Sequence, residues 1–191
     1  MAGCLVLRLL SADGTNRLTR TTVRALKERL AQWTAGPRPA PLVIVGNDKF
    51  FSAGADLREI SQLDGTAALE FSRMGQDLMQ ALNDFPAPVF AAISGYCMGG
   101  GLDLALACHR RIASPHAIFG HRGAALGLIT GWGGTQRLPR LIGKGRALEM
   151  FVAAEEVSAT SALRMGLVDT IAEDPVAEAM RRIVTHSDEP F

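Results

Sequence analysis

Several features are scarce in this 191-residue sequence, and their scarcity narrows the possible functions. Lys and Arg number 20 against 19 Asp and Glu, so no strong electrostatic field marks a nucleic-acid or membrane partner. The three cysteines, Cys4, Cys97 and Cys108, form no Cys-x-x-Cys pair, which argues against a disulfide framework and a zinc site. We therefore expect free thiols, a reducing compartment and no bound metal.

Long apolar runs are also missing. No segment approaches the roughly 20 consecutive apolar residues that a membrane-spanning helix needs, and no basic region precedes the first apolar run as in a signal peptide. These absences predict a cytoplasmic protein. Hydrophobic residues make up 48% and charged residues 20% of the chain, both ordinary for a globular protein. The length suits one domain, or one domain with a small extension.

Hydrophobic spacing divides the chain into short apolar runs that alternate with helices. Continuous apolar runs predict strands at 4–10, 42–45 and 89–93. Helical spacing predicts helices at 19–33 and 66–84, a third from the glycine cluster to about residue 108, and a helical tail after 143. The residues at 50–56 read as a loop, and Pro-rich breaks stand at 36–41 and 85–88. Strands that alternate with helices indicate the α/β class.

Two glycine-containing loops each follow a predicted buried strand. Gly54 lies in the first, and Gly99, Gly100 and Gly101 form the second, which opens a helix. Unpaired N–H groups at such a helix start converge on one point and suit a phosphate or a developing oxyanion. Glycines also let a ligand approach the backbone closely. A turn that only permits tight helix–strand packing explains the same residues equally well.

The glycine spacing does not match the nucleotide-binding loops. The pattern that begins at Gly95 is Gly-x-x-x-Gly-Gly-Gly, whereas a dinucleotide fold uses Gly-x-Gly-x-x-Gly and a following acid. Gly143-Lys144 is followed by Gly145 and not by the Ser or Thr of a P-loop. A dinucleotide-dependent oxidoreductase is therefore disfavoured. An oxyanion hole for a carbonyl remains, with its second N–H supplied by the loop around Gly54.

Four segments jointly resemble the signatures of the crotonase, or enoyl-CoA hydratase/isomerase, superfamily, in family order and at family spacing from about residue 5 to about residue 172. The segments are Ser52-Ala-Gly-Ala-Asp-Leu-Arg-Glu59, Ala91-Ala-Ile-Ser-Gly-Tyr-Cys-Met-Gly-Gly-Gly-Leu-Asp-Leu-Ala-Leu-Ala-Cys108, Phe119-Gly120 with Gly133-Gly-Thr-Gln-Arg-Leu-Pro-Arg140, and Ala162-Leu-Arg-Met-Gly-Leu-Val168. The resemblance implies a spiral of repeated ββα units, assembled as a trimer or a dimer of trimers. It also implies an acyl-CoA thioester as partner, with coenzyme A entering as part of the substrate and no separate cofactor.

The resemblance further implies which residues form the site. The family's two oxyanion donors fall on the N–H groups of Ala55 and Gly100, which would stabilise negative charge on a thioester oxygen as its α-carbon becomes enolate-like. The substrate-binding residues are expected to be Ala53, Asp56, Leu57, Arg58, Gly123 and Trp132. Arg58 stands where the family often has a basic residue near the coenzyme A phosphates. A solvated Arg on a polar turn explains it equally well.

The acid/base positions depart from the family pattern. The first carboxylate position holds Asp103 in place of the usual Glu, nearly one helical turn after Gly100 and therefore on the same face. An acid in a first helical turn also complements the helix dipole without any catalytic role. The second carboxylate position matches Gly123, and no Asp or Glu occurs between Asp103 and Glu149. This absence argues against hydration by two carboxylates.

Other side chains near the vacant position offer alternatives. His121 could serve as an acid/base near pH 7, and Arg122 could bind a second carboxylate on a malonyl-type substrate. His109, at the far end of the Asp103 helix, suits a structural or surface role. Tyr96 is expected to be buried and not catalytic. Trp132 either lines the acyl pocket or packs beneath it, and plain packing is favoured.

These observations predict an acyl-CoA-binding enzyme that stabilises a thioester enolate. Isomerisation or decarboxylation is easier to defend than two-carboxylate hydration, because one carboxylate suffices to move a proton between carbons. The alternative is a non-catalytic acyl-CoA-binding or assembly protein of the same fold. We expect a crotonase-like core over 1–143 and a helical region over 144–191. This second region is shorter than the family's usual one, which predicts a pocket that is more open or covered by another subunit.

Overall fold

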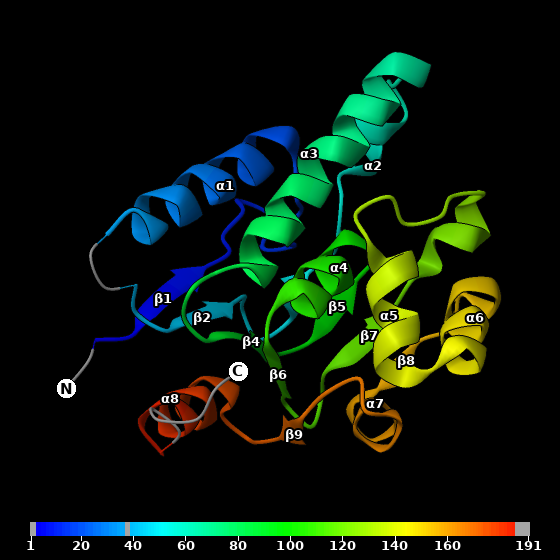
Figure 1. Ribbon diagram of the computed structural model, residues 1–191. Helices are drawn as coiled ribbons and strands as arrows, with labels where there is room; N and C mark the ends of the chain where they lie inside the picture. Colours follow the sequence, from blue (N-terminus) through cyan, green and yellow to red (C-terminus); the bar gives the residue numbers. More distant parts are fainter. Residues whose placement is uncertain (1–2, 37–38, 186–191) are drawn as a thin grey trace.

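The computed structural model describes residues 3–36 and 39–185, which form short strands and longer helices in alternation (Figure 1). The strands are β1 (Leu5–Arg8), β2 (Leu42–Val45), β3 (Phe50–Ser52), β4 (Val89–Ile93), β5 (Tyr96–Met98), β6 (Arg110–Ala113), β7 (Ile118–Gly120), β8 (Val157–Ser158) and β9 (Thr170–Ile171). The α-helices are α1 (Arg20–Thr34), α2 (Leu57–Ile60), α3 (Gly65–Asn83), α4 (Gly100–Ala107), α5 (Gly134–Ile142), α6 (Lys144–Ala153), α7 (Ala159–Met165) and α8 (Pro175–Thr185). A 3₁₀ helix, η1, covers Arg122–Leu126.

The strands form two sheets, and strands β2 to β7 alternate between them along the chain. The five-stranded sheet has the order β1-β2-β4-β6-β9 and is parallel throughout, while the four-stranded sheet has the order β3-β5-β7-β8. In the pairs β2/β3, β4/β5 and β6/β7, the first strand joins the larger sheet and the second joins the smaller one. Helices follow β3 and β5 directly. The α/β class and the predicted spiral of ββα units are therefore confirmed.

Six strands of the described residues lie where the sequence predicted none: β3, β5, β6, β7, β8 and β9. The segment at 50–56, predicted as a loop, contains β3, and the glycine-rich turn from Gly95 contains β5. Three residues are too few to produce a periodic hydrophobic signal, and these strands are stabilised by pairing with each other and with β7. The helical tail likewise contains β8 and β9.

Tyr96 contradicts the expectation that it is buried. Its side chain is 41% exposed, whereas that of Cys97 is fully buried. Successive residues of a strand point to opposite faces, so the short strand β5 directs Cys97 to the core and Tyr96 outward. The Tyr96 ring packs on Phe50 of the neighbouring strand, with centroids 5.4 Å apart.

Helices cover both faces of the five-stranded sheet (Figure 1). The long helices α1 and α3 lie side by side on one face, and α8 packs on the other, where Ala179 is fully buried against Val43, Phe90 and Ile112. Strand β9 pairs with β6 of the same sheet. The division into 1–143 and 144–191 stays a prediction, and its residues 1–2 and 186–191, like residues 37–38 of the Pro-rich break, lie outside the described residues.

The described residues include neither a candidate membrane-spanning helix nor a candidate metal cluster. None of their helices combines the length and the apolar character needed to cross a membrane. No group of three or more His, Cys, Asp or Glu side chains in this part of the chain is placed to hold a metal ion. Cys4, Cys97 and Cys108 are free thiols.

The turn between β4 and β5 stacks directly on the turn between β2 and β3. Gly95 has φ +59°, and a Cβ atom there would overlap the carbonyl oxygen of Lys49, which accepts a hydrogen bond from the N–H of Tyr96 at 2.9 Å. A side chain at Gly95 would therefore meet both backbone strain and a collision, and the two contributions can be separated experimentally.

We predict that Gly95→Ala destabilises the protein more than Gly166→Ala does. Gly166 caps α7 at φ +81°, and its nearest contact for an added Cβ is 4.0 Å away. The control should therefore lose only about 1–2 kcal/mol of unfolding free energy, from the strain of a left-handed backbone. Gly95→Ala should lose more, because its Cβ also overlaps Lys49. Urea unfolding of both variants provides the measurement. Equal losses of unfolding free energy would contradict the stacked-turn geometry.

Candidate functional site

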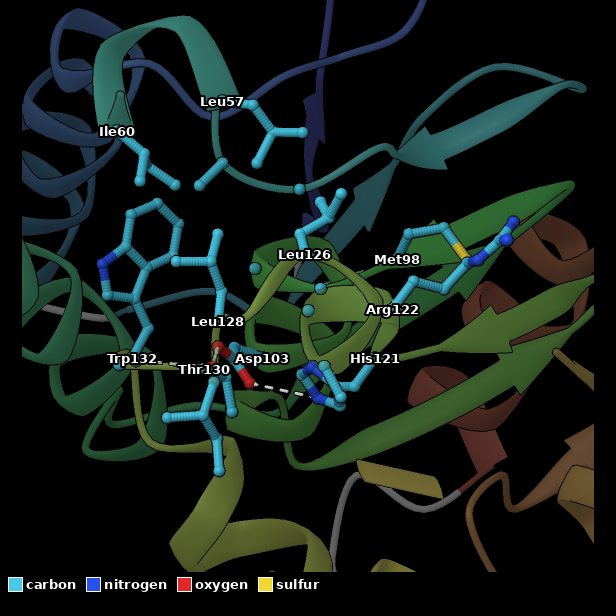
Figure 2. Close-up of a pocket in the computed structure, with 18 of the residues that line it drawn as sticks. Leu57, Ile60, Met98, Asp103, His121, Arg122, Leu126, Leu128, Thr130 and Trp132 are labelled. Atoms are coloured by element: carbon cyan, nitrogen blue, oxygen red, sulfur yellow. Dashed lines mark hydrogen bonds and ion pairs between the residues drawn. The ribbon is translucent and has the colours of Figure 1, made fainter. Parts of the chain in front are cut away.

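A cavity of about 930 Å³ opens beside the N-terminus of α4 (Figure 2). Its walls come from the segment that leads into α2, from α3, from the β5–α4 turn, from residues 121–132 and from α6. Leu57, Ile60, Leu126 and Leu128 project into it from opposite sides (Figure 2). A concave, mainly apolar space with a few polar groups is the usual form of a small-molecule site.

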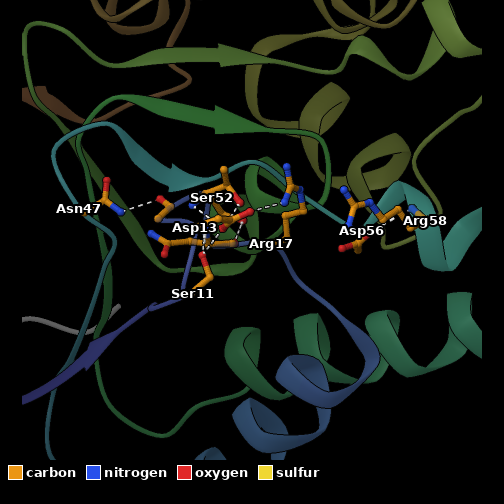
Figure 3. Close-up of polar contacts among 10 residues, drawn as sticks. Ser11, Asp13, Arg17, Asn47, Ser52, Asp56 and Arg58 are labelled. Atoms are coloured by element: carbon orange, nitrogen blue, oxygen red, sulfur yellow. Dashed lines mark hydrogen bonds and ion pairs between the residues drawn. The ribbon is translucent and has the colours of Figure 1, made fainter.

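Most of the predicted site residues line this one cavity. The residues that do so are Ala53, Ala55, Leu57, Gly100, Asp103, Gly123 and Trp132. Asp56 and Arg58 do not line it. Asp56 caps α2 and accepts a hydrogen bond from the Arg58 N–H at 2.8 Å (Figure 3), and the Arg58 side chain is exposed. The catalytic and binding roles of all nine residues stay predictions.

Backbone hydrogen bonds fix the loop that contains Ala55. The Ala53 N–H donates to the Thr15 carbonyl at 2.9 Å, and the Leu18 N–H donates to the Gly54 carbonyl at 2.9 Å. Among the hydrogen bonds of the described residues, none uses the N–H of Ala55. The loop is therefore held on both sides of a free donor at the wall of the cavity.

Asn16 anchors the same loop from below. It is 2% exposed with φ +52°, and its Nδ2 donates to the carbonyls of Phe50 at 2.9 Å and Phe51 at 3.3 Å. The Ser52 hydroxyl donates in turn to the Asn16 carbonyl at 2.7 Å, within the polar network of Figure 3. Asn16 is a positioning residue that the sequence did not single out, because its partners are backbone carbonyls far away in the chain.

The second glycine-rich loop lies against the first. A Cβ at Gly54 would lie 3.0 Å from the Gly100 nitrogen, and a Cβ at Gly100 would lie 3.2 Å from the Ala55 nitrogen. Gly100 is the first residue of α4, so its N–H has no acceptor within the helix. Two unpaired N–H groups therefore stand next to each other at one wall of the cavity, an arrangement that suits an oxygen carrying negative charge.

Trp132 packs beneath this wall and also lines the cavity. Its side chain is 3% exposed, and its Nε1 donates to the Phe71 carbonyl at 3.2 Å. A Cβ at Gly75 would overlap the indole, and one at Gly100 would lie 2.7 Å from the ring. From the sequence, packing in the core and lining the cavity are alternatives for Trp132. In the structure, the side chain does both.

Asp103 is the buried acidic residue among those that line the cavity, and its side chain is 1% exposed. Its Oδ2 accepts a short hydrogen bond from the Thr130 hydroxyl, while its Oδ1 has no hydrogen-bond partner among the described residues. Burial raises the pKa of Asp103 to about 7, against the opposing effects of the Thr130 hydroxyl, the Arg137 guanidinium and the Gly134 N–H. Thr130, which the sequence did not suggest, leaves the carboxyl with one free oxygen.

His121 faces that free oxygen. Its Nε2 lies 3.4 Å from Asp103 Oδ1, a contact marked by a dashed line in Figure 2. Its ring packs on Phe151 with centroids 5.1 Å apart. Burial lowers the pKa of His121 to about 4. The imidazole is therefore neutral near pH 7.

The vacant second-carboxylate position is closed by the backbone. The Leu128 N–H donates to the Gly123 carbonyl at 2.8 Å, and a Cβ at Gly123 would lie 2.7 Å from the Leu128 carbonyl oxygen. Arg122 is exposed and lies 3.3 Å from Glu156 Oε1. Residues 122–128 thus form a tight turn that has no room for a side chain at 123.

His109 has the structural role that the sequence favoured. Its Nδ1 accepts a hydrogen bond from the Val89 N–H at 2.9 Å, and its Nε2 lies 3.0 Å from the Asn83 carbonyl oxygen. These contacts tie the end of α4 to the start of β4 and to the end of α3.

The raised pKa of Asp103 predicts how stability depends on pH. The folded protein prefers the protonated carboxyl up to about pH 7, whereas the ordinary value is 3.8. The stabilisation is therefore complete below about pH 4 and is lost as the pH rises to about 7. A pKa shift of this size corresponds to a loss of unfolding free energy of the order of 4 kcal/mol.

Asp103→Asn removes this titration, so its unfolding free energy relative to wild type should increase between pH 4 and pH 7. Chemical denaturation of both proteins across that range measures the difference. The lowered pKa of His121 has the opposite sign and destabilises both proteins as the pH falls below 6.5. Parallel pH curves for the two proteins would show that Asp103 does not titrate as described.

Comparison with known proteins identifies relatives of the whole described chain. A sequence model of the enoyl-CoA hydratase/isomerase family matches residues 1–189. The crotonyl-CoA hydratase of Syntrophomonas wolfei is 38% identical over 159 residues, which are 83% of this chain and 61% of that protein. This chain therefore spans about three-fifths of the length of that curated relative.

Solved structures have the same fold. The structure of Pseudomonas aeruginosa DspI matches with a TM-score of 0.93 at 34% identity, covering 100% of this chain and 73% of that one. A crystal structure of an enoyl-CoA hydratase from Bacillus anthracis matches with a TM-score of 0.86 at 34% identity, covering 95% of this chain and 70% of that one.

Proposed function

Because the chain belongs to the enoyl-CoA hydratase/isomerase family, we propose that it binds an acyl-CoA thioester in the cavity and directs the thioester oxygen to the N–H groups of Ala55 and Gly100. Both groups lack acceptors within the described part of the chain and border the cavity, and the positive end of α4 adds to their effect. A single donor of this kind contributes about 3 kcal/mol to transition-state stabilisation. The apolar wall accommodates the acyl chain, and coenzyme A enters as part of the substrate.

Asp103 is the base in this proposal. It removes a proton from the α-carbon: the C–H bond breaks, an O–H bond forms on Oδ1, and the electron pair moves onto the thioester oxygen. The observation that supports this role is the single free carboxylate oxygen at the cavity. Returning the proton to another carbon of the chain completes the isomerisation of a 3-enoyl-CoA to a 2-enoyl-CoA.

Hydration, the activity in the name of the Syntrophomonas relative, is the competing reaction. It would require a second group to activate water, and the turn at Gly123 leaves no space for a carboxylate there. Decarboxylation of a malonyl-type thioester would draw on Arg122, whose guanidinium is already paired with Glu156. Both observations favour isomerisation. Assembly as a trimer or a dimer of trimers belongs to the same proposal, as does a contact between Arg58 and the coenzyme A phosphates.

Asp103→Asn tests the reaction directly. With a 3-enoyl-CoA, we expect wild type to form the 2-enoyl-CoA and the variant to lose at least about a hundredfold in kcat, because proton transfer needs the carboxylate. Binding of a saturated acyl-CoA, measured by calorimetry, should persist in both proteins. Product analysis by mass spectrometry after incubation with a 2-enoyl-CoA distinguishes hydration.

The outcomes separate the possible functions. A hydrated product would replace isomerase by hydratase. Binding without turnover of any CoA ester in a broad panel would show a non-catalytic acyl-CoA-binding protein, the alternative to an enzyme. Isomerisation by wild type that persists in Asp103→Asn would exclude Asp103 as the base.

The backbone donor at Ala55 can be removed without deleting a hydrogen bond of the fold. Ala55→Pro eliminates the N–H, whereas the matched control Ala55→Ser retains it. We expect Ala55→Pro to lower kcat by about a hundredfold or more and Ala55→Ser to stay close to wild type. Thermal unfolding of both variants checks that the loop remains folded. Equal activity of a folded Ala55→Pro and the serine control would rule out this donor.

A further inference from the structure

The contact between Asp103 and His121 extends the chemistry of the site. We infer that His121 is a second acid/base residue, which takes from Asp103 the proton released by the α-carbon and delivers it to the γ-carbon of the acyl chain. This inference rests on the proposed isomerisation. It assigns a role to a residue outside the two-carboxylate arrangement that the sequence resemblance implied.

The first support is the isolation of the two facing atoms. Asp103 Oδ1 and His121 Nε2 are 3.4 Å apart, and both are buried without a hydrogen-bond partner among the described residues. Two such atoms cost free energy unless a proton lies between them or a ligand reaches them. Both residues line the cavity (Figure 2), so an acyl chain in the cavity would meet both groups.

Gly134 creates the space in which these atoms meet. A Cβ at this position would overlap Asp103 Oδ1 and would lie 3.1 Å from His121 Nε2. Gly134 is the first residue of α5 and follows Gly133, whose φ is +105°. Helix α5 therefore begins with a residue that has no side chain. A side chain at this position would separate Asp103 from His121.

The second support is that Asp103 is held in one orientation. The Thr130 hydroxyl occupies Oδ2, so only Oδ1 can accept a proton from substrate, and the carboxyl cannot turn without losing this hydrogen bond. The α- and γ-carbons of the acyl chain are separated by another carbon. With Oδ1 fixed towards the first of these carbons, His121 Nε2, 3.4 Å to one side, offers a separate proton donor for the second. Phe151 packs against the imidazole, with the two ring planes tilted by 46°.

The proton balance closes without any other reactant. Asp103 takes the α-proton, and the C–H electron pair forms the dienolate. The O–H bond then breaks as an N–H bond forms on neutral His121, which leaves a carboxylate beside an imidazolium. Finally the N–H bond breaks as a C–H bond forms at the γ-carbon from the dienolate electron pair. Asp103 and His121 return to their starting states.

The electrostatics of the pocket suit the second half of this transfer, the donation from His121 to carbon. Burial keeps His121 neutral at pH 7 by lowering its pKa to about 4, so the ring can accept a proton. The same burial makes the imidazolium a strong acid, which favours donation to carbon. The first half is uphill, because the pKa of Asp103 is raised to about 7, and the carboxylate left 3.4 Å from the imidazolium offsets part of this cost.

His121→Gln tests the inference, with His116→Gln on an exposed loop as the matched control. Two rates are measured in D₂O: conversion of a 3-enoyl-CoA to the 2-enoyl-CoA, and deuterium incorporation at the α-carbon. We expect His121→Gln to lose about a hundredfold or more in isomerisation kcat, with little change in KM, while α-exchange continues because Asp103 is intact. Asp103→Asn should lose both rates, and the control should lose neither.

His121→Ala provides a second variant in case the glutamine disturbs packing. Free imidazole added to His121→Ala should restore isomerisation, an effect that a purely structural role would not produce. Isomerisation by His121→Gln close to the wild-type rate would overturn the inference. Loss of both rates in His121→Gln, without imidazole rescue of His121→Ala, would also overturn it. If wild type itself neither exchanges nor isomerises, the proposed function has failed, and the inference fails with it.

Discussion

The site depends on one close backbone approach, between the loop at 52–56 and the start of α4. A Cβ at Gly54 would lie 2.6 Å from the Met98 carbonyl oxygen, and one at Gly101 would lie 2.6 Å from the Ser52 carbonyl oxygen. The two loops can touch only because these positions lack side chains. Their contact brings the free N–H groups of Ala55 and Gly100 to one wall and sets Asp103, one turn further along α4, above the same space.

The two-sheet spiral explains why these loops meet. Each ββα unit contributes one strand to each sheet in the same direction, so equivalent turns stack along the spiral. The loop after β3 and the loop after β5 are equivalent turns of neighbouring units. The two neighbouring donors therefore result from the repeat, and Asn16 holds the strand that leads into the first loop by its backbone carbonyls.

Much of this arrangement could be predicted from the sequence. Buried strands such as 42–45 and 89–93 were evident from continuous apolar runs, and the long helices from their spacing, because both signals are local. Strands such as β3 and β5 were not predicted, because three residues are too few to show a periodic hydrophobic pattern. The grouping of Ala55, Gly100 and Asp103 at one cavity followed from motif resemblance. Thr130 and Gly134 did not, because their significance lies in contacts with Asp103 that no spacing along the chain records.

Gly134 shows how a residue without a functional group can determine chemistry. A Cβ atom at this position would lie against both Asp103 Oδ1 and His121 Nε2. A single added methyl group would therefore push the two side chains apart without removing any reactive atom. Among relatives of this fold, the combination to look for is a histidine directly after β7 together with a glycine that opens α5. Proteins with that combination would share the same route of proton transfer. A classification based only on their catalytic carboxylates would not group them together.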